Sequence, residues 1–367
     1  MRLMKNISIL ALILGVVLCC SQKKSSDYLS KSWKYVATKM PSEWYGSDEA
    51  KLVAENVLLA QKEIGGWEKN KPYHKKFSAS ERAHYVNDKA EIGATFDNNA
   101  TITELRFLAK VYSHFNDERY KKAFEKGLNY IFISQYKNGG WPQFYPVRKG
   151  HVAYSGHITY NDDAMVNTMN FLNEIFSGKE DYASLQISKG TKEKARKSYE
   201  KGIQCILNTQ IVKDGKATVW CAQYDEITLA PANARSYELS SYSGSESVGI
   251  VQLLMDIKTP SKKVIASVKG AISWFESHKI EGIRIDREVS TNGKKNKVVV
   301  KDPKSEPLWA RFYDLKTEKP FFCSRDGIKR NSLSEISDNR RNGYGWYTNA
   351  PEKVLKRYPV WESKKVN

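Results

Sequence analysis

The sequence predicts an all-α protein, an α/α toroid in which helical hairpins form an incomplete barrel with small β or irregular insertions. Two observations lead to this fold class. Several segments carry apolar residues at three- and four-residue spacing, which is the pattern of amphipathic helices. A short motif of glutamine, glycine and tryptophan also returns along the chain, which is typical of a repeated structural unit.

The helical pattern covers much of the chain beyond residue 48. The predicted helices are Ala50–Gln61, Ile102–Phe115, Glu118–Gln135, Ala164–Phe176, Lys192–Gln210, Ser247–Met255 and Lys262–His278. Strand-like alternation of side chains is limited to short stretches, for example Ile283–Ile285 and Lys297–Val300. With Thr291-Asn292-Gly293 between them, these two stretches predict a small hairpin-like insertion.

The repeated motif places a glutamine at the end of a predicted helix, then a glycine-containing turn and then a tryptophan. Its copies run from Gln61 to Trp67, from Gln135 to Trp141 and from Gln210 to Trp220. A helix stop beside a packed aromatic residue is the simpler interpretation. The nearly equal intervals favour successive helical hairpins around an axis, with the recurring turns gathered at one end as a site.

The N-terminus has the features of a bacterial export signal. A basic start with Arg2 and Lys5 precedes an apolar stretch at 7–18, and Cys19 and Cys20 follow. The stretch is shorter than the roughly 20 residues that a transmembrane helix needs. The cysteine pair resembles a lipoprotein lipidation site, with Cys20 (or Cys19) as the acceptor. A plain cleaved signal peptide or an uncleaved anchor is the alternative.

The signal divides the chain into three parts: residues 1–20 as a lipoprotein signal peptide, 21–47 as a polar linker or tether, and 48–367 as one catalytic domain. Hydrophobic residues make up 41% of the chain, which is enough for a sizeable core. Beyond the signal, Cys205, Cys221 and Cys323 are odd in number and lack C-x-x-C spacing, so no zinc site or disulfide framework is indicated. A Cys205–Cys221 bridge is conceivable.

The chain also carries a strong excess of positive charge. It has 59 Lys and Arg against 41 Asp and Glu, a formal net charge of +18, which attracts polyanions. Nucleic acid, acidic lipid and acidic polysaccharide all fit this charge. Export to the bacterial cell envelope, periplasmic or at the outer membrane, argues against nucleic acid and favours an acidic polysaccharide. We expect a monomer attached to the membrane through its lipid anchor.

Short polar clusters precede two of the predicted helices. Asp97, Asn98 and Asn99 come just before Ile102, and Asn161-Asp162-Asp163 opens the helix at Ala164. Helix capping explains one or two such residues in each cluster, and it is the simpler interpretation. Carboxylate and amide oxygens are also the ligands that calcium prefers. Asp97, Asp162 and Asp163 are therefore candidate metal ligands.

Arginines beside aromatic residues form the complement of these carboxylates. Arg235 lies close to Tyr237, Arg311 is followed by Tyr313, and Arg325 comes further along. A guanidinium pairs with a carboxylate through two hydrogen bonds, while aromatic faces stack on sugar rings, so such segments suit a carboxylated sugar. Structural pairs of arginine with aspartate are the commoner use of each segment taken alone.

Taken together and in order, the motifs resemble polysaccharide lyase family 10, the all-helical pectate lyases. The likeness runs from about residue 48 to about residue 350. Two positions depart from the family pattern: Asn99 stands where glycine is frequent, and Tyr224 where histidine is frequent. The motifs are Asp97-Asn98-Asn99-Ala100-Thr101, Asn138-Gly139-Gly140-Trp141-Pro142-Gln143, Tyr160-Asn161-Asp162-Asp163-Ala164-Met165, Cys221-Ala222-Gln223 to Arg235, and Arg311-Phe312-Tyr313-Asp314 to Ser324-Arg325-Asp326-Gly327.

The resemblance implies a toroid that cleaves α-1,4-polygalacturonate by calcium-assisted β-elimination and leaves 4,5-unsaturated oligogalacturonates. It implies Arg325 as the catalytic base and Arg235 as the group that neutralises a substrate carboxylate. It also implies Ca²⁺ at Asp97 and at Asp162 or Asp163. The substrate-binding residues that it implies are Asn98, Asn161, Arg311 and Tyr313.

The role of Arg325 rests on this resemblance alone, because arginine is normally always protonated and residue type would disfavour it as a base. Two other functions stay open. A toroid glycoside hydrolase would use two carboxylates, such as Asp163 and Asp225, and would leave no double bond in its product. A non-catalytic pectin-binding surface lipoprotein would use the arginines and aromatic residues without cutting the polymer.

Overall fold

The structure is a computed structural model, and it describes residues 27–289, 293 and 295–364. The predicted signal peptide, Cys19, Cys20, the first part of the predicted linker at 21–26, and Thr291 and Asn292 of the predicted hairpin turn lie outside the described residues. The α-helices are α1 Trp33–Lys39, α2 Asp48–Ala60, α3 Ala79–Asn87, α4 Ile102–Phe115, α5 Glu118–Ile133, α6 Ala164–Ser177, α7 Lys189–Thr209, α8 Glu246–Met255, α9 Lys262–Ser277, α10 Asp338–Gly343 and α11 Pro351–Ser363.

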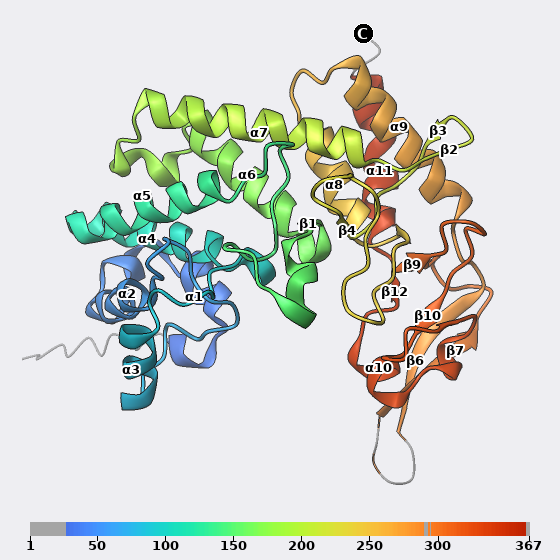
Figure 1. The fold of residues 1–367 in the computed structure, drawn as a ribbon, viewed down its shortest axis with the longest axis horizontal. Helices are drawn as coiled ribbons and strands as arrows, with labels where there is room; N and C mark the ends of the chain where they lie inside the picture. Colours follow the sequence, from blue (N-terminus) through green and yellow to red (C-terminus); the bar gives the residue numbers. More distant parts are fainter. Residues whose placement is uncertain (1–26, 290–292, 294, 365–367) are drawn as a thin grey trace, which may run out of the picture.

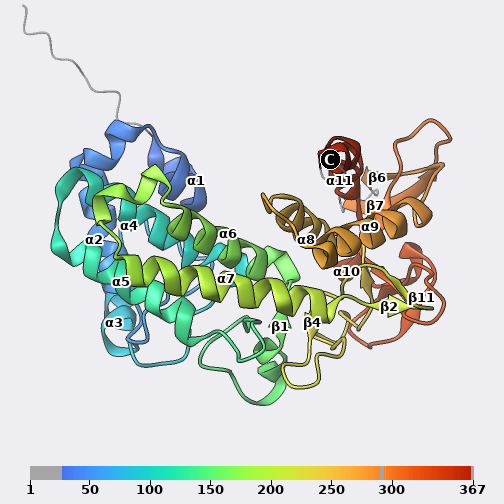
Figure 2. The same cartoon turned by 90° about the horizontal axis from the view of Figure 1, so that it is seen from above.

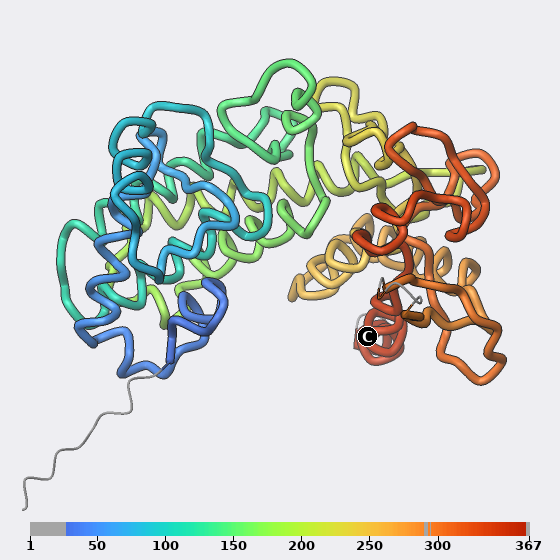
Figure 3. The backbone as a smooth tube through the Cα atoms, turned by 90° about the horizontal axis from the view of Figure 1, so that it is seen from below, coloured from blue at the N-terminus to red at the C-terminus, as the bar shows by residue number. Residues whose placement is uncertain are grey.

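The longer helices form two rows along an arc (Figures 1 and 2). Helices α1, α4, α6, α8 and α11 contact one another in succession as the inner row, and α2, α5, α7 and α9 form the outer row. The arc does not close, because the blue N-terminal and red C-terminal segments lie at its opposite ends (Figure 3). This arrangement confirms the predicted incomplete α/α toroid.

The long loops of the protein all run from the end of an outer helix to the start of the next inner helix. They span residues 61–101, 134–163, 210–245 and 278–350. Because the two rows alternate, these loops gather on one face of the arc, at the same end of the helices. The green and yellow loops in Figure 2 show this for residues 134–163 and 210–245. The loop end is therefore where residues distant in sequence meet.

Within the described residues the strands lie in these loops, and all but β6 and β7 have only two residues. They pair as six antiparallel two-stranded sheets, β1 with β4, β2 with β3, β5 with β9, β6 with β7, β8 with β12 and β10 with β11. The hairpin of β6 and β7 confirms the predicted insertion. The strands are β1 Ile158–Thr159, β2 Val212–Lys213, β3 Lys216–Ala217, β4 Gln223–Tyr224, β5 Tyr242–Ser243, β6 Ile283–Val289, β7 Lys295–Lys301, β8 Trp309–Ala310, β9 Phe312–Tyr313, β10 Phe322–Cys323, β11 Lys329–Arg330 and β12 Tyr347–Thr348.

The glutamine–glycine–tryptophan motif is a true structural repeat. Each tryptophan is fully buried, and its indole Nε1 donates a hydrogen bond to a carbonyl of the preceding outer helix. These bonds are Trp67 to Val57 O (2.8 Å), Trp141 to Ile131 O (2.9 Å), Trp220 to Ile206 O (2.8 Å) and Trp309 to Phe275 O (2.9 Å). The copy at Trp309 was not predicted, because its outer helix is followed by His278 instead of a glutamine.

The glutamines join consecutive outer helices. The amide of Gln61 donates to Ala123 O of α5, that of Gln135 to Ser198 O of α7, and that of Gln210 to Ser267 O of α9. Each amide also donates to the carbonyl of its own turn, at Gly65, Gly139 or Thr218. One side chain therefore closes the turn and fixes the next hairpin, which is why the motif recurs.

The segment 27–47 is not a tether, and this part of the prediction is wrong. It forms a short 3₁₀ turn, α1 and a second 3₁₀ turn, and α1 packs on α4. Val36 and Ala37 are fully buried, and Trp44 and Tyr45 join the main core. The apolar residues of α1 and the turn after it follow helical spacing, but the lysines and serines among them hid the pattern. Helices α3, α10 and α11 were not predicted either.

The core is continuous through both rows of helices, and a smaller cluster around Phe312, Phe322 and Trp346 lies among the C-terminal strands. Cys205, Cys221 and Cys323 are all free and buried, so the conceivable Cys205–Cys221 bridge is not formed. Within residues 27–289 and 295–364, no helix has the length and apolar character to cross a bilayer.

Candidate functional site

Two short turns with the same backbone form one side of the site. The 3₁₀ turns Asp97–Asn99 and Asn161–Asp163 precede α4 and α6, and they contact each other. Their second residues have φ near 52° and 51°, and their third residues 63° and 58°. Asparagine and aspartate adopt this left-handed conformation more readily than other side chains. Asn99 thus takes a conformation that suits glycine, which is frequent there in the resembled family.

Asp97 has the clearest metal-ligand geometry of the three predicted aspartates. Its side chain is 4% exposed, and Oδ2 forms an ion pair with Lys69 Nζ. Its Oδ1 is buried and has no hydrogen-bond partner among the described residues. A buried carboxylate oxygen without a partner is costly unless a ligand satisfies it. This atom therefore fits a bound cation.

Asp162 and Asp163 lie at the neighbouring turn and keep contact with solvent. Partial burial, together with the carboxylates of Glu246 and Asp162, raises the pKa of Asp163 to about 6. Asp163 also faces α8 closely, since a Cβ at Gly249 would lie 2.2 Å from Asp163 Oδ1. A cation beside this cluster would relieve the repulsion between its carboxylates.

Arg311 connects this turn to the C-terminal half of the site. Its Nη2 donates to Asn161 Oδ1 at 3.1 Å and lies 3.6 Å from Asp162 Oδ1. It also forms an ion pair with the buried carboxylate of Glu246 at the start of α8. Burial lowers the pKa of Arg311, but Glu246 outweighs burial and raises the pKa above its usual range. Arg311 is therefore a fixed positive charge beside Asn161.

The remaining arginines of the site lie around the rings of two tyrosines. The rings of Tyr237 and Tyr344 meet edge to face with centroids 5.4 Å apart. Around Tyr237 lie the guanidinium carbons of Arg235 (4.9 Å), Arg325 (5.8 Å) and Arg340 (4.5 Å), while Arg311 (4.7 Å) and Arg235 (5.9 Å) lie around Tyr344. The structure thus brings together arginines that are far apart in the sequence.

Arg235 and Arg325 differ in how they are held. Arg235 Nε donates to Glu238 Oε2 at 2.7 Å, and the hydrogen bonds that Arg235 donates to Glu238 raise the pKa of Arg235 above its usual range. Arg325 is exposed and, within the described part of the chain, its guanidinium has no ion pair or hydrogen bond. Arg235 is locked in its charged form, whereas the nitrogens of Arg325 are open to a ligand.

Asn98 is exposed beside Asp97, and its Nδ2 donates to Asn70 Oδ1 at 2.9 Å. Tyr313, by contrast, is not brought to the site. Its ring is 2% exposed, and its hydroxyl donates to His278 O and accepts from Ala310 N. Tyr313 is a core residue of the fourth repeat, so its prediction as a substrate-binding residue is not supported by its position.

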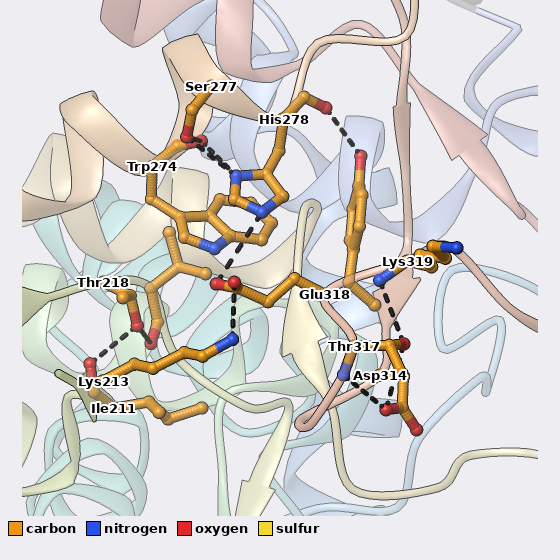
Figure 4. Close-up of polar contacts among 12 residues, drawn as sticks. Ile211, Lys213, Thr218, Trp274, Ser277, His278, Asp314, Thr317, Glu318 and Lys319 are labelled. Atoms are coloured by element: carbon orange, nitrogen blue, oxygen red, sulfur yellow. Dashed lines mark hydrogen bonds and ion pairs between the residues drawn. The ribbon is translucent and has the colours of Figure 1, made fainter.

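The turn between β9 and β10 is fixed to the rest of the protein by Glu318 (Figure 4). Glu318 Oε2 accepts from Lys213 Nζ at 2.6 Å, and Oε1 lies 3.8 Å from His278 Nε2. The ring of His278 stacks on Trp274 with centroids 4.1 Å apart. These contacts anchor the chain between Arg311 and Arg325.

The three predicted metal ligands do not form a preassembled cluster in which three ligand atoms lie close together. In the parts of the chain that the structure describes, the group with that geometry is His157, Asp225 and Glu226, with ligand atoms within 4.8 Å of one another. The donors at the candidate site nonetheless suit calcium, which takes six to eight oxygen ligands and so accepts several from a substrate and from water.

Asp225, one of the two acids of the hydrolase hypothesis, has a structural role. Its Oδ1 accepts hydrogen bonds from Ile227 N, Thr228 N and Thr228 Oγ1. Asp314 Oδ1 closes the turn of the next repeat with the same three kinds of bond. This equivalence identifies Asp225 as a turn residue and removes the main residue support for a hydrolase.

Sequence reasoning missed four residues of the site: Lys69, Glu238, Glu246 and Tyr344. Glu238 stands three residues after Arg235, a spacing that could have suggested the pair. Glu246 reads as an ordinary acidic residue at a helix start. Nothing local marks Lys69, whose partner Asp97 lies 28 residues further along the same loop, or Tyr344, whose partners Arg235 and Glu238 lie in another loop.

Comparisons with known proteins agree with this geometry. A family model described as pectic acid lyase matches residues 61–355. A solved family 10 polysaccharide lyase from Cellvibrio cellulosa is 33% identical over 88% of this chain and 96% of that chain, with a TM-score of 0.73. A mutant of that lyase, in complex with trigalacturonic acid, is 32% identical over 87% of this chain and 97% of its own, with a TM-score of 0.72. No curated protein matches.

The family match covers most of the described chain, including both carboxylate turns and all the arginines around Tyr237 and Tyr344. The chain belongs to the pectic acid lyase family.

Proposed function

We propose that this pectate lyase cleaves α-1,4-linked polygalacturonate by calcium-assisted β-elimination and releases 4,5-unsaturated oligogalacturonates. The observation that carries this proposal is the arginine cluster around Tyr237 and Tyr344, joined through Arg311 to the turn at Asn161. The complex of the solved relative with trigalacturonic acid supports galacturonate as the ligand. Fixed positive charges beside carboxylate turns suit both an acidic sugar and a divalent cation.

The reaction removes the proton at C5 of a galacturonate. The electron pair forms the C4=C5 double bond, the C4–O bond breaks, and the leaving oxygen takes up a proton. Negative charge develops on the C6 carboxylate during proton removal, so positive groups placed there stabilise the transition state. Arg235 and Arg311 supply such charges, each oriented by a buried glutamate.

Arg325 is the proposed base at C5. It is the arginine of the cluster whose guanidinium nitrogens are not held by a carboxylate within the described residues, so they are free to approach a substrate. A general base must come within hydrogen-bond reach of the proton that it removes. Asn98 and Asn161, at the two turns, are placed to contact sugar hydroxyl groups.

Calcium would be held by Asp97 Oδ1 together with Asp162 or Asp163. When bound, Ca²⁺ neutralises the substrate carboxylate and favours loss of the C5 proton. Asp97 keeps one buried oxygen for this purpose while Lys69 satisfies the other. The carboxylates of Asp162 and Asp163 are both accessible from solvent, which allows either to complete the site.

The test is the ultraviolet absorbance of polygalacturonate incubated with the signal-free protein, first with calcium and then with a chelator. Conjugated C4=C5 product that accumulates only with calcium supports the proposal, and Arg325→Ala should then abolish it while Arg330→Ala, at a neighbouring half-buried arginine paired with Asp326, does not. Reducing ends without new absorbance would indicate a hydrolase. Pectate binding without cleavage would indicate a surface binding protein.

We further propose that the enzyme is a monomeric lipoprotein of the bacterial cell envelope, lipidated at Cys20 or else at Cys19. The support is the sequence of the export segment. Mass spectrometry of the mature N-terminus in the producing bacterium, compared between Cys20→Ala and Cys19→Ala variants, identifies the modified cysteine. A mature protein without lipid in both the wild type and the variants would contradict the anchor.

A further inference from the structure

A pocket of about 270 Å³ lies beside the first carboxylate turn, outside the arginine cluster. One of its walls is the turn itself, with Asn98 and Asn99, and another is α1, with Trp33 and Lys34. Its volume is slightly below the range of about 300–1,000 Å³ typical of small-molecule sites. The pocket therefore has room for about one sugar unit of a chain that continues into the catalytic centre.

We propose that this pocket is an additional uronate-binding subsite, in which Lys34 pairs with the carboxylate of a galacturonate unit next to the catalytic centre. The inference rests on the proposed function. It gives a role to α1, which precedes the residues matched by the family model.

Lys34 is the group best placed to bind an acidic sugar. Its side chain is exposed, and it has no ion pair within the described residues. It lines the pocket together with Asn98 and Asn99 of the first carboxylate turn. The ammonium group of Lys34 is therefore placed at the same pocket as this turn.

The other charges of the pocket do not repel a uronate. Glu68 is neutralised by ion pairs with Lys62 (2.8 Å) and Lys71 (3.1 Å). Glu104 is 1% exposed, and burial raises its pKa to about 7, so its negative charge is incomplete near neutral pH. Two lysines on one glutamate leave this group net positive, and Lys34 adds a positive charge that has no ion pair within the described residues.

Glu104 also fixes the shape of the wall. Trp33 Nε1 donates to Glu104 Oε1 at 2.6 Å, and the indole stacks parallel to His74 at an interplanar angle of 6°. Glu104 Oε2 is buried without a hydrogen-bond partner in the described chain. A buried carboxyl group that lines the pocket with one unsatisfied oxygen is a second sign, independent of Lys34, that the pocket accommodates a polar ligand.

Amide groups complete the pocket. Asn70 and Asn98 are exposed at its edge and bonded to each other, and Asn99 is half-buried beside them. Amides donate to and accept from hydroxyl groups equally well. The combination of an ammonium group, amides and an indole suits a sugar that carries both hydroxyls and one carboxylate.

The experiment compares Lys34→Gln with Lys39→Gln, which removes an equal charge from the same helix at an exposed position outside the pocket. Binding of a galacturonate oligomer series to both proteins in an Arg325→Ala background is measured by calorimetry, with calcium present. We expect Lys34→Gln to weaken binding of the longer oligomers by about fivefold to tenfold, the effect of one charge-assisted contact. Lys39→Gln should bind as the parent does.

A methyl-esterified oligomer of the same length provides the second arm. If Lys34 pairs with a substrate carboxylate, replacing Lys34 should not change the affinity for the esterified oligomer. Equal affinity of the two variants for the acidic oligomers, or an equal loss for both kinds of ligand, would overturn the subsite. Because binding is measured without turnover, the result is separate from the cleavage assay: a wild-type protein that binds oligomers but does not cut them would contradict the proposed function and leave this test intact.

Discussion

At the scale of single residues, the site depends on a carboxylate that no sequence motif identified. Glu238 is 7% exposed, and it accepts hydrogen bonds from Arg235 Nε at 2.7 Å and from the hydroxyl of Tyr344 at 2.6 Å. It therefore fixes Arg235 against both tyrosine rings, one of which also lies beside Arg311. Glu238 is a positioning residue for two arginines that we propose to bind substrate.

We expect Glu238→Gln to lower kcat/KM for polygalacturonate by about 10- to 100-fold, because Arg235 loses its ion pair and its fixed orientation. The free energy of unfolding should fall by about 1–3 kcal/mol, the cost of a weakened buried hydrogen-bond network. Steady-state kinetics and urea unfolding measure the two effects. Tyr344→Phe, which removes only one hydroxyl, should lower kcat/KM and the free energy of unfolding by less than Glu238→Gln does. Unchanged kinetics in Glu238→Gln would contradict the positioning role.

Glu104 gives the protein a pH-dependent stability. Burial raises its folded-state pKa from 4.5 to about 7, so between these values the folded protein binds more protons than the unfolded chain. Stability therefore falls as the pH rises through this window and stays lower above it. Glu104→Gln cannot ionise, so it should unfold at a higher temperature than the wild type at pH 8 and at a similar one at pH 4.5.

The size of this effect follows from the shift in pKa, at about 1.4 kcal/mol for each unit, which gives on the order of 3–4 kcal/mol between the two ends of the window. Thermal unfolding of both proteins across the pH range measures it. Parallel curves for the wild type and Glu104→Gln would show that Glu104 is already ionised in the folded state. Lys39→Gln, outside the pocket, serves as the control for a simple change of surface charge.

At the scale of elements, the helices of the repeat were predictable and their connections were not. Apolar spacing alone predicted α2 and α4 to within two residues of their observed ends. It missed α1, which has only seven residues and is interrupted by Lys34, and α11, which contains Pro359. The fourth repeat was not predicted, because His278 stands where the other three repeats have a glutamine.

The glycine of each repeat turn gives a test of this element. Gly139 has φ 94°, and a Cβ there would lie 2.1 Å from the carbonyl oxygen of Lys201 in α7. Gly215 also has positive φ, 75°, but a Cβ there would meet no atom within 4 Å. Both alanine variants incur the strain of a left-handed residue, about 1 kcal/mol, whereas Gly139→Ala must also displace backbone.

We therefore expect Gly139→Ala to lower the free energy of unfolding by at least 2 kcal/mol more than Gly215→Ala does, as an order-of-magnitude difference from the added overlap with backbone. Urea unfolding of both variants measures the difference. A similar loss in the two proteins would mean that α5 and α7 can separate at this turn without cost, which the paired hydrogen bonds of Gln135 argue against.

At the scale of the whole molecule, the arc explains why the site was only partly predictable. Motifs at Asp97, Asn161 and Arg311 could be recognised in the sequence, because each lies in one continuous stretch. The ion pair of Arg311 with Glu246 and the position of Tyr344 beside Arg235 and Arg311 arise only when loops 210–245 and 278–350 meet near the start of α8. Tyr313 shows the converse, since a residue adjacent to a site motif points into the core.

The net charge of +18 acts at this scale too, because it surrounds the arginine-rich end of the arc with a positive potential. A polyanionic substrate is attracted over a distance that salt shortens, from about 10 Å at 0.1 M ionic strength to about 3 Å at 1 M. We expect KM for polygalacturonate to rise severalfold between about 0.05 and about 0.5 M NaCl at constant free calcium. We expect kcat to stay nearly unchanged, because the contacts within the substrate-bound site are partly buried and therefore less screened by salt. The KM for trigalacturonate, a control substrate with few charges, should rise less with salt. An equal rise of KM for the short and long substrates would place the salt effect in the site itself and not in the electrostatic field of the whole protein.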